Sequence, residues 1–404
     1  MTATTPAAGG IADPTAGPVP PDAAFVVVGG GPTGHAAVTA YRAAGGTGRV
    51  VLFSADEHPP YNRPPLSKDF LRAESDTDTL PLAPDTWYAA NGVELVLRER
   101  VRSLDLLAHT VTTSNGRVER FGTCLLATGS VPVELSVPGA ERALPLRFLT
   151  QAQRLRDAAG TARRAVVIGS GFIGCEAAAS LRARDVAVTM ISSEPSPQQA
   201  RLGDAASARI SGWLTAAGVR IIGDAKATEV TAEAVVLDDG RSIPADLVLA
   251  AVGVEPQSEL AERAGLAVSD HRIEVDEQMR TADPRVLAAG DVALARNGGA
   301  GRALPVEHWG EAERMGEVAG TVAAGGTDSW DNVPGFWSEI GEHTLKYAAW
   351  GDGFDDQRLV EHDGGGFTVW YRRDGVAVGV LTSEADDDYE RGQELIAAKQ
   401  PPPD

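Results

Sequence analysis

Two glycine-rich stretches have the composition and spacing of phosphate-binding loops. Each follows a run of Val and Ile and precedes an alanine-rich segment with helical periodicity. In such a loop the first glycine permits a tight turn, the second lets the backbone approach a pyrophosphate, and the third lets the helix pack on the strand. The pattern predicts two dinucleotide sites, one at Gly29, Gly31 and Gly34 and the other at Gly169, Gly171, Phe172, Ile173 and Gly174.

The strand that follows each loop ends in residues that could contact a ribose. Asp56 and Glu57 follow the run RVVLF, and by position we expect Asp56 to accept hydrogen bonds from a ribose 2′-OH. The strand after the second loop ends in Ser192, Ser193 and Glu194. A 2′-OH requires an acid and a 2′-phosphate requires a cation, and neither stands clearly at this place. Both NADH and NADPH therefore stay open, with NADH favoured.

The stretch YNRPPLSK carries two cations on a stiff loop just after the first acidic strand end. Pro64 and Pro65 hold φ at about −65° and should lead into a helix that Ser67 caps. Lys68 is one of only four lysines among 36 basic residues. We therefore expect Arg63 and Lys68 to face a bound cofactor.

The elements that position these residues follow an internal repeat. A strand, glycine loop, helix and strand begin near Phe25 and again near Ala165, and each unit precedes short strands around a turn, SNGR or DDGR, and an apolar strand that ends near a glycine. After about residue 332 the stretch FTVWYRRDGVAVGVL reads as a hairpin, and a helix is expected around residues 389–399. The fold class is therefore α/β, with two Rossmann-like dinucleotide-binding domains and a small α+β C-terminal domain.

Composition excludes several classes of protein. The formal charge of −20 argues against a nucleic-acid or anionic-membrane surface. No apolar run is long enough for a membrane helix and no signal peptide is recognisable, so we expect a cytoplasmic protein. Cys124 and Cys175 lack CxxC or metal-ligand spacing, so we expect two buried free thiols, no disulfide and no metal site. Residues 1–21 are poor in large apolar side chains and read as a disordered tail.

Further motifs carry a resemblance to a known family. Ala127, Thr128 and Gly129, the run VGVEP, and VLAAGDVA with Gly290 and Asp291 are similar to motifs of glutathione-reductase-like flavoproteins with two dinucleotide-binding domains. Within that superfamily, PYNRPPLSKDFL, VEHW and PGFWSE resemble the FAD-dependent NAD(P)H:ferredoxin reductases that serve oxygenases, of the putidaredoxin reductase and biphenyl dioxygenase type, and the related apoptosis-inducing factor. The resemblance covers about residues 23–345.

The resemblance implies a division of the chain and a set of site residues. It implies an FAD-binding domain at 22–133 and 256–331, an NAD(P)-binding domain at 134–255 and a C-terminal domain at 332–404. FAD would be held by the first glycine loop and by Asp56, Arg63, Lys68, the backbone near Val101, Thr128, Asp291, Glu307, His308 and Trp309. NAD(P)H would lie on the second loop, with Glu176 near the nicotinamide and Gly253 closing over it. Lys68 and Glu176 are the expected catalytic residues, whereas His308 is expected to be structural.

Three functions remain open at this level. Disulfide reductases of the superfamily need cysteines beside the flavin, and this chain has no such pair, so hydride transfer from NAD(P)H to flavin N5 is expected without thiol chemistry. The leading hypothesis is a reductase of a ferredoxin-type iron-sulfur protein, with arginines at 100, 102, 372 and 373 as candidate docking charges. The alternatives are an NAD(P)H oxidase or redox sensor of the apoptosis-inducing-factor type, and a nucleotide-binding module whose dimerisation responds to reduction. A monomer or a homodimer is expected.

Overall fold

The first nucleotide-binding unit is built around a parallel sheet. The computed structural model describes residues 23–403, so the predicted disordered tail at 1–21 lies outside the described residues. The strands run in the order β3-β2-β1-β6-β5-β4, and β19 pairs with β6. β1 and β2 are fully buried apolar runs rich in Val, as is typical of parallel central strands. The bounds are β1 Ala24–Val28, α1 Pro32–Ala43, β2 Val50–Phe53, α2 Asp69–Arg72, α3 Asp85–Ala90, β3 Val93–Val96, β4 Val101–Asp105, β5 Thr110–Thr113, β6 Val118–Leu126 and β19 Val286–Ala288.

The second unit repeats the first. Its parallel sheet has the order β11-β10-β9-β15-β8, and a separate antiparallel sheet, β12-β13-β14, stands where β4 and β5 stand in the first unit. The bounds are β8 Leu144–Pro145, α4 Leu149–Ala159, β9 Arg164–Ile168, α5 Phe172–Ala183, β10 Ala187–Ile191, α6 Gln199–Ala216, β11 Arg220–Ile222, β12 Ala227–Val230, β13 Ala234–Leu237, β14 Ser242–Pro244 and β15 Leu247–Ala250. The chain passes between the two units through β7, Ser130–Pro132, and β16, Val254–Pro256, which pair antiparallel.

The glycine loops of the two units pack in the same way. A Cβ added to Gly29 would lie 2.0 Å from the carbonyl oxygen of Ala127, and one added to Gly169 would lie 2.2 Å from that of Ala251. The third glycine of the second loop, Gly174, is equally close to its own loop, because a Cβ there would lie 2.3 Å from the carbonyl oxygen of Gly169. These approaches are between backbone atoms, so both loops require glycine for packing at these positions.

Gly174→Ala is therefore expected to lower the free energy of unfolding by about 1–3 kcal/mol, because neither backbone can move away without disturbing the sheet. Gly212→Ala is the matched control, since Gly212 also lies within a helix and an added Cβ would meet no atom within 4 Å. Chemical denaturation of the two variants should show loss of stability for Gly174→Ala only. Equal stability of both would contradict this packing role.

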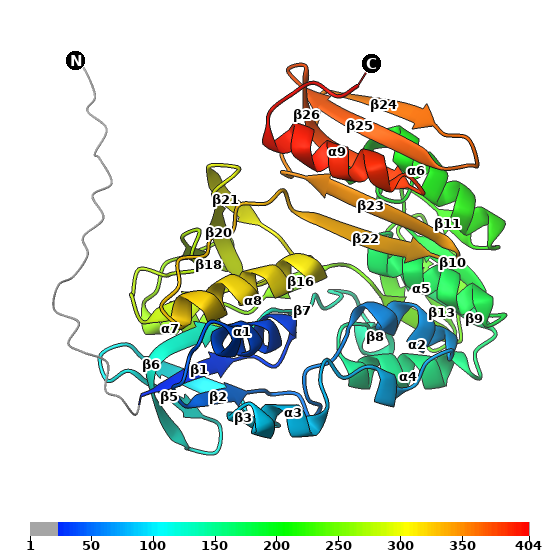
Figure 1. The fold of residues 1–404 in the computed structure, drawn as a ribbon. Coiled ribbons are helices and arrows are strands. Elements are labelled where there is room, and N and C mark those ends of the chain that lie inside the picture. Colours follow the sequence, from blue (N-terminus) through cyan, green and yellow to red (C-terminus); the bar gives the residue numbers. More distant parts are fainter. Residues whose placement is uncertain (1–22, 404) are drawn as a thin grey trace, which may run out of the picture.

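Helix α8, Trp309–Ala323, lies against α1 and closes the first unit (Figure 1). Added Cβ atoms at Gly316 and Gly320 would lie 2.4 and 2.1 Å from carbonyl oxygens of α1, so the two helix backbones approach closely. Gly316 lies at Thr33 and Gly320 at Ala37, so the two helices run in the same direction and both begin at the cavity described below. The remaining elements of this part are α7 Glu259–Ala264, β17 Val268–Ser269, β18 Arg272–Val275, β20 Ala293–Asn297 and β21 Arg302–Pro305.

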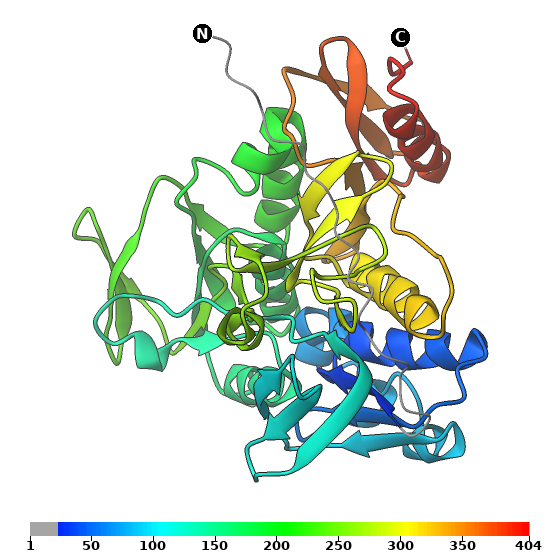
Figure 2. The ribbon, with the colours of Figure 1, turned by 90° about the vertical axis from the view of Figure 1, so that its left-hand side faces the viewer.

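The C-terminal segment forms a five-stranded antiparallel sheet, β22-β23-β26-β25-β24, covered by α9. Figure 2 shows it, in orange and red, at the top of the view beside the green second unit. One face packs on the second unit, where Tyr371 donates a hydrogen bond to the carbonyl oxygen of Leu202 over 2.9 Å. The bounds are β22 Gly335–Ile340, β23 His343–Ala349, β24 Asp356–Glu361, β25 Phe367–Arg373, β26 Val376–Ser383 and α9 Asp386–Ala397.

The predicted fold class is confirmed: two Rossmann-like units and a small α+β segment are present. The predicted hairpin around RDG is β25 and β26. The domain boundaries given above stay predictions. Among residues 23–403, no helix combines the length and hydropathy that crossing a bilayer requires.

Candidate functional site

One large cavity of about 1070 Å³ runs along the carboxyl ends of both parallel sheets. It is lined by both glycine loops, by YNRPPLSK and by the segment at the start of α8. Most of the predicted site residues lie on its wall, namely Gly29, Gly31, Asp56, Arg63, Lys68, Val101, Ala127, Thr128, Gly129, Gly171, Phe172, Ile173, Glu176, Gly253, Asp291, Glu307, His308 and Trp309. The structure thus brings residues of both units to one continuous space.

Five predicted residues do not line the cavity: Gly34, Gly169, Gly174, Ser192 and Gly290. Gly169 and Gly174 pack the second loop, as described above, and an added Cβ at Gly34 would lie 2.1 Å from the carbonyl oxygen of Gly29. A Cβ at Gly290 would meet the Thr33 hydroxyl oxygen at 2.4 Å. Ser192 is fully buried, lies 2.8 Å from the Ser170 hydroxyl and accepts a hydrogen bond from the backbone N–H of Glu194. Because this hydroxyl is already satisfied away from the cavity, we propose no ribose contact for Ser192.

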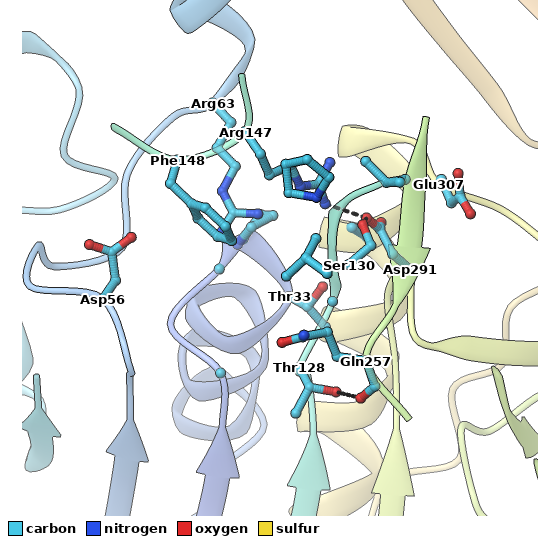
Figure 3. Close-up of a pocket in the computed structure, with 18 of the residues that line it drawn as sticks. Thr33, Asp56, Arg63, Thr128, Ser130, Arg147, Phe148, Gln257, Asp291 and Glu307 are labelled. Carbon is cyan, nitrogen blue, oxygen red and sulfur yellow. Dashed lines mark hydrogen bonds and ion pairs between the residues drawn. The ribbon is translucent and has the colours of Figure 1, made fainter. Parts of the chain in front are cut away.

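Asp291 lies at the junction of β19 and the cavity, and it is held by two other segments (Figure 3). Ser130 donates a hydrogen bond to its Oδ2 over 2.6 Å, and Arg147 forms an ion pair with the same oxygen. Burial alone would raise the pKa of Asp291, but the charge of Arg147 and the bonds from Ser130 and Arg147 outweigh it and lower the pKa. Asp291 is therefore ionised at neutral pH.

Arg63 fits an anionic group in this part of the cavity. Its guanidinium lies over the rings of Tyr61 and Phe148, and its Nε is buried without a hydrogen-bond partner among the described residues. Burial, together with the nearby charge of Arg147, lowers its pKa. Figure 3 shows the Arg63 and Arg147 side chains close together above α1. Two cations, the N-terminus of α1 and one buried carboxylate line this part of the cavity, so the residues present fit the pyrophosphate and polyol of FAD.

Asp56 lies three residues after the end of β2, on the cavity wall and at a distance from Asp291 in the same view (Figure 3). Tyr61 donates a hydrogen bond to its Oδ2 over 3.1 Å, and the backbone N–H of His58 donates to Oδ1. The neighbouring Glu57 instead pairs with Arg98 at the surface. Of the two acids in SADE, Asp56 is therefore the one held in place for a ribose, and its contact with the cofactor stays a proposal.

Lys68 and Glu176 meet where the two units adjoin. Nζ of Lys68 lies 2.9 Å from Oε2 of Glu176 and 3.0 Å from the carbonyl oxygen of Pro64. Both side chains are almost fully buried yet reach the cavity wall. Pro64–Ser67 is a 3₁₀ helix followed by α2, so the expected helix is present.

The expected capping by Ser67 is wrong. Neither the 3₁₀ helix nor α2 has a side-chain cap, because the Ser67 hydroxyl donates to Oε2 of Glu176 over 2.5 Å. A buried carboxylate needs donors more than an exposed helix end does, since water can satisfy the helix end.

The segment before α8 closes the cavity on the side of the C-terminal sheet. His308 lies against the ring of Phe336, and burial, with the charge of Arg201, lowers its pKa to about 4. It is therefore uncharged at physiological pH, which agrees with the expected structural role. Burial raises the pKa of Glu307, although it forms an ion pair with Arg272. Trp309 begins α8 at the cavity wall.

Both cysteines are buried and free, as predicted. Burial raises the pKa of both thiols, so neither provides a thiolate at neutral pH. Neither lines the cavity. Among the described residues, no group of three or more His, Cys, Asp or Glu could hold a metal ion.

Replacing both thiols, Cys124→Ala with Cys175→Ala, is expected to leave NAD(P)H-dependent turnover within about twofold of the unmodified chain, because no thiolate forms beside the cavity. Steady-state rates at 25 °C with FAD content measured in parallel would check this. A fall of more than tenfold in a variant with full FAD content would show that electrons pass through sulfur.

Sequence reasoning missed Arg147, Ser130 and Phe148. Arg147 follows β8, a strand of two residues that shows no alternation of apolar and polar positions. Its contact with Asp291 joins residues 144 positions apart. No local pattern in the sequence indicates the partner of Arg147. Its position shortly after a short strand was the one weak signal that it could lie at the site.

Comparisons with known proteins agree with the geometry of the site. The family model described as pyridine nucleotide-disulphide oxidoreductase matches residues 23–316. Rubredoxin-NAD(+) reductase of Pseudomonas putida is 32% identical over 330 residues, which cover 80% of this chain and 86% of that protein. The 5,5′-dehydrodivanillate O-demethylase ferredoxin reductase subunit of Sphingobium sp. (strain NBRC 103272 / SYK-6) is 33% identical over 383 residues, 92% of each chain.

The fold is shared with a solved complex. The structure of the covalent putidaredoxin reductase-putidaredoxin complex superposes with a TM-score of 0.89 at 28% identity and covers 94% of each chain. These matches confirm the resemblance that the motifs indicated.

Proposed function

This chain belongs to the pyridine nucleotide-disulphide oxidoreductase family, and we propose that within it the protein is an NAD(P)H-dependent reductase of a small iron-sulfur protein that serves an oxygenase. It is an oxidoreductase, and its cofactors are FAD and NAD(P)H. The curated relatives are reductases named for rubredoxin or ferredoxin, which supports a one-electron acceptor of that class. We place the reaction in the cytoplasm.

One observation carries the proposal. A single cavity joins both glycine loops, and the buried Lys68–Glu176 pair stands on its wall between them. An enzyme that passes electrons between two dinucleotides needs both in one space, with their reactive rings held together and water excluded. When bound, FAD accepts a hydride from NAD(P)H and gives up electrons singly to an acceptor.

The residues of the chain have separate tasks in this proposal. Arg63 and the N-terminus of α1 bind the pyrophosphate of FAD, and Asp291 accepts hydrogen bonds from its polyol. Lys68 supplies positive charge at the junction, which stabilises the negative charge of reduced flavin. Glu176 holds Lys68 in position. Phe172 and Ile173 line the second unit's side of the cavity, where NAD(P)H is expected.

Docking of an acidic iron-sulfur protein on a chain of charge −20 requires local positive charge. Of the four arginines suggested by the sequence, Arg372 pairs with Asp356 and Arg373 with Asp355. These two are neutralised and are poor docking charges. Arg100 and Arg102 are exposed and reach the rim of the cavity, so we propose them as the better pair.

Anaerobic titration with NADH and NADPH tests the cofactor part of the proposal. The purified chain should carry one FAD, and either nucleotide should bleach its absorbance, with NADH more effective at equal concentration. A chain that neither copurifies with flavin nor rebinds it would overturn the proposal. Flavin that bleaches but is reoxidised only by air would favour an NAD(P)H oxidase instead.

A further inference from the structure

Glu176 is held by side chains from two distant parts of the chain. Ser67 and Lys68 contact its Oε2, at 2.5 and 2.9 Å. Ser338, on β22 of the C-terminal sheet, donates a hydrogen bond to its Oε1 over 2.7 Å. All four side chains are buried, and Ser338 is fully buried. The carboxylate at the junction of the two nucleotide units is therefore positioned from both sides by buried side chains.

The register of β22 on α5 makes this contact specific. Phe172 and Glu176 are four residues apart on one face of α5, and Phe336 and Ser338 are two residues apart on one face of β22. The ring centroids of Phe172 and Phe336 lie 4.7 Å apart, and this contact lies beside the hydrogen bond between Ser338 and Glu176. The residue between them, Trp337, is 40% exposed and points to the other face. Two adjacent contacts thus fix the strand on the helix.

The partners of Oε2 of Glu176 are positioned by the same helix, α5. Ser180, one turn beyond Glu176 on α5, donates a hydrogen bond to the carbonyl oxygen of Ser67 over 2.7 Å. This contact anchors the 3₁₀ helix that presents Ser67 and Lys68. Helix α5 therefore positions the carboxylate and both of its partners on Oε2.

The charge balance shows what Ser338 contributes. Ser338 is the one donor that the described residues give to Oε1, because Ser67 and Lys68 both use Oε2. A hydrogen bond to a buried carboxylate spreads its charge and stabilises the ionised form. Lys68 has two acceptors, Glu176 and the carbonyl oxygen of Pro64, which leaves its third N–H for the cavity.

From this geometry we infer that Ser338 is a positioning residue of the redox site, by which the C-terminal sheet sets how strongly Glu176 compensates the charge of Lys68. The inference deepens the proposed function and rests on it. Without the hydroxyl, the carboxylate of Glu176 keeps hydrogen-bond partners only on the side of Lys68. Its negative charge then compensates the positive charge of Lys68 more strongly. The positive field at the cavity weakens, so reduced flavin is less stabilised.

Ser338→Ala tests this. In stopped flow, the limiting rate of flavin reduction by NADH should fall about tenfold, the size expected for one hydrogen bond to a charged group. The NADH concentration at half-maximal rate should stay within about twofold, because the second glycine loop is untouched. The flavin midpoint potential should move to a more negative value. Ser338→Thr, which keeps the hydroxyl, should restore both the rate and the potential.

The matched control is Ser207→Ala, another buried serine with one hydrogen bond, to the carbonyl oxygen of Pro197 and away from the cavity. It should leave rate and potential unchanged. An unchanged or more positive potential in Ser338→Ala, or equal effects of the Ala and Thr variants, would overturn the inference. Failure of NADH to reduce the unmodified chain would instead overturn the proposed function, and no iron-sulfur partner is needed for either result.

Discussion

Lys68→Met is expected to slow flavin reduction by NADH about 100-fold, or about 2.7 kcal/mol in activation free energy, while FAD stays bound. The substitution removes the positive charge 2.9 Å from Glu176 and leaves that buried carboxylate without its counter-ion. The flavin is then reduced beside a net negative charge, which opposes the negative charge that it gains. Stopped-flow absorbance and a redox titration of the FAD-loaded variant would measure the rate and the potential.

Two further variants separate chemistry from folding. Lys68→Met combined with Glu176→Gln removes the uncompensated charge and should recover the stability that Lys68→Met loses, although the rate stays low. Lys346→Met removes a lysine that pairs with Asp386 at the surface of the C-terminal sheet. It should change neither the stability of the chain nor the rate of flavin reduction. A wild-type rate and potential in Lys68→Met would show that Lys68 only packs the junction.

Asp291→Asn is expected to lower the free energy of unfolding of the FAD-free chain by about 3–5 kcal/mol at pH 7, the usual cost of removing one partner of a buried ion pair. Arg147 would lose its counter-ion close to Arg63, with both cations facing the cavity. Denaturant unfolding followed by tryptophan fluorescence would measure the loss. Asp352→Asn is the control, because Asp352 and Arg302 form an exposed pair, and it should cost less than about 1 kcal/mol.

The same residue predicts a dependence of stability on pH. The pKa of Asp291 is lowered in the folded chain, so its contribution is complete above the unfolded value of about 3.9 and is lost as the pH falls through the folded value. The unmodified chain should therefore lose this contribution below about pH 4, and Asp291→Asn should lack it at every pH. If the stability of the two chains fell by the same amount as the pH was lowered, the stabilising role of ionised Asp291 would be contradicted.

Local patterns were enough to predict the framework of the site. Runs of Val and Ile before Gly29 and Gly169 encode buried parallel strands. Glycine is required at both positions because an added Cβ would lie only 2.0 or 2.2 Å from a backbone carbonyl oxygen. Asp56 could be expected on the cavity wall because it follows the end of β2 by three residues. These features depend on residues close in sequence, where periodicity and turn chemistry are informative.

Contacts between distant segments could not be predicted in this way. Ser67 had the residue type and position of a helix cap, but tertiary structure directs its hydroxyl to Glu176, 109 positions away. Ser338 and Arg147 reach the site from 162 and 144 positions away, and neither lies in a pattern that names its partner. Ser192 ended its strand at the place expected for ribose recognition, yet its hydroxyl is turned inward to Ser170.

The central claim is that electrons enter from NAD(P)H, cross the flavin beside Lys68 and leave singly to an iron-sulfur protein. The most direct test is the rate at which the NADH-reduced chain is reoxidised in the absence of air, with and without an oxidised two-iron ferredoxin. We predict rapid reoxidation that increases with ferredoxin concentration and is slowed by salt, because docking involves charge. Reoxidation that no ferredoxin accelerates, in a chain that NADH reduces fully, would contradict the claim.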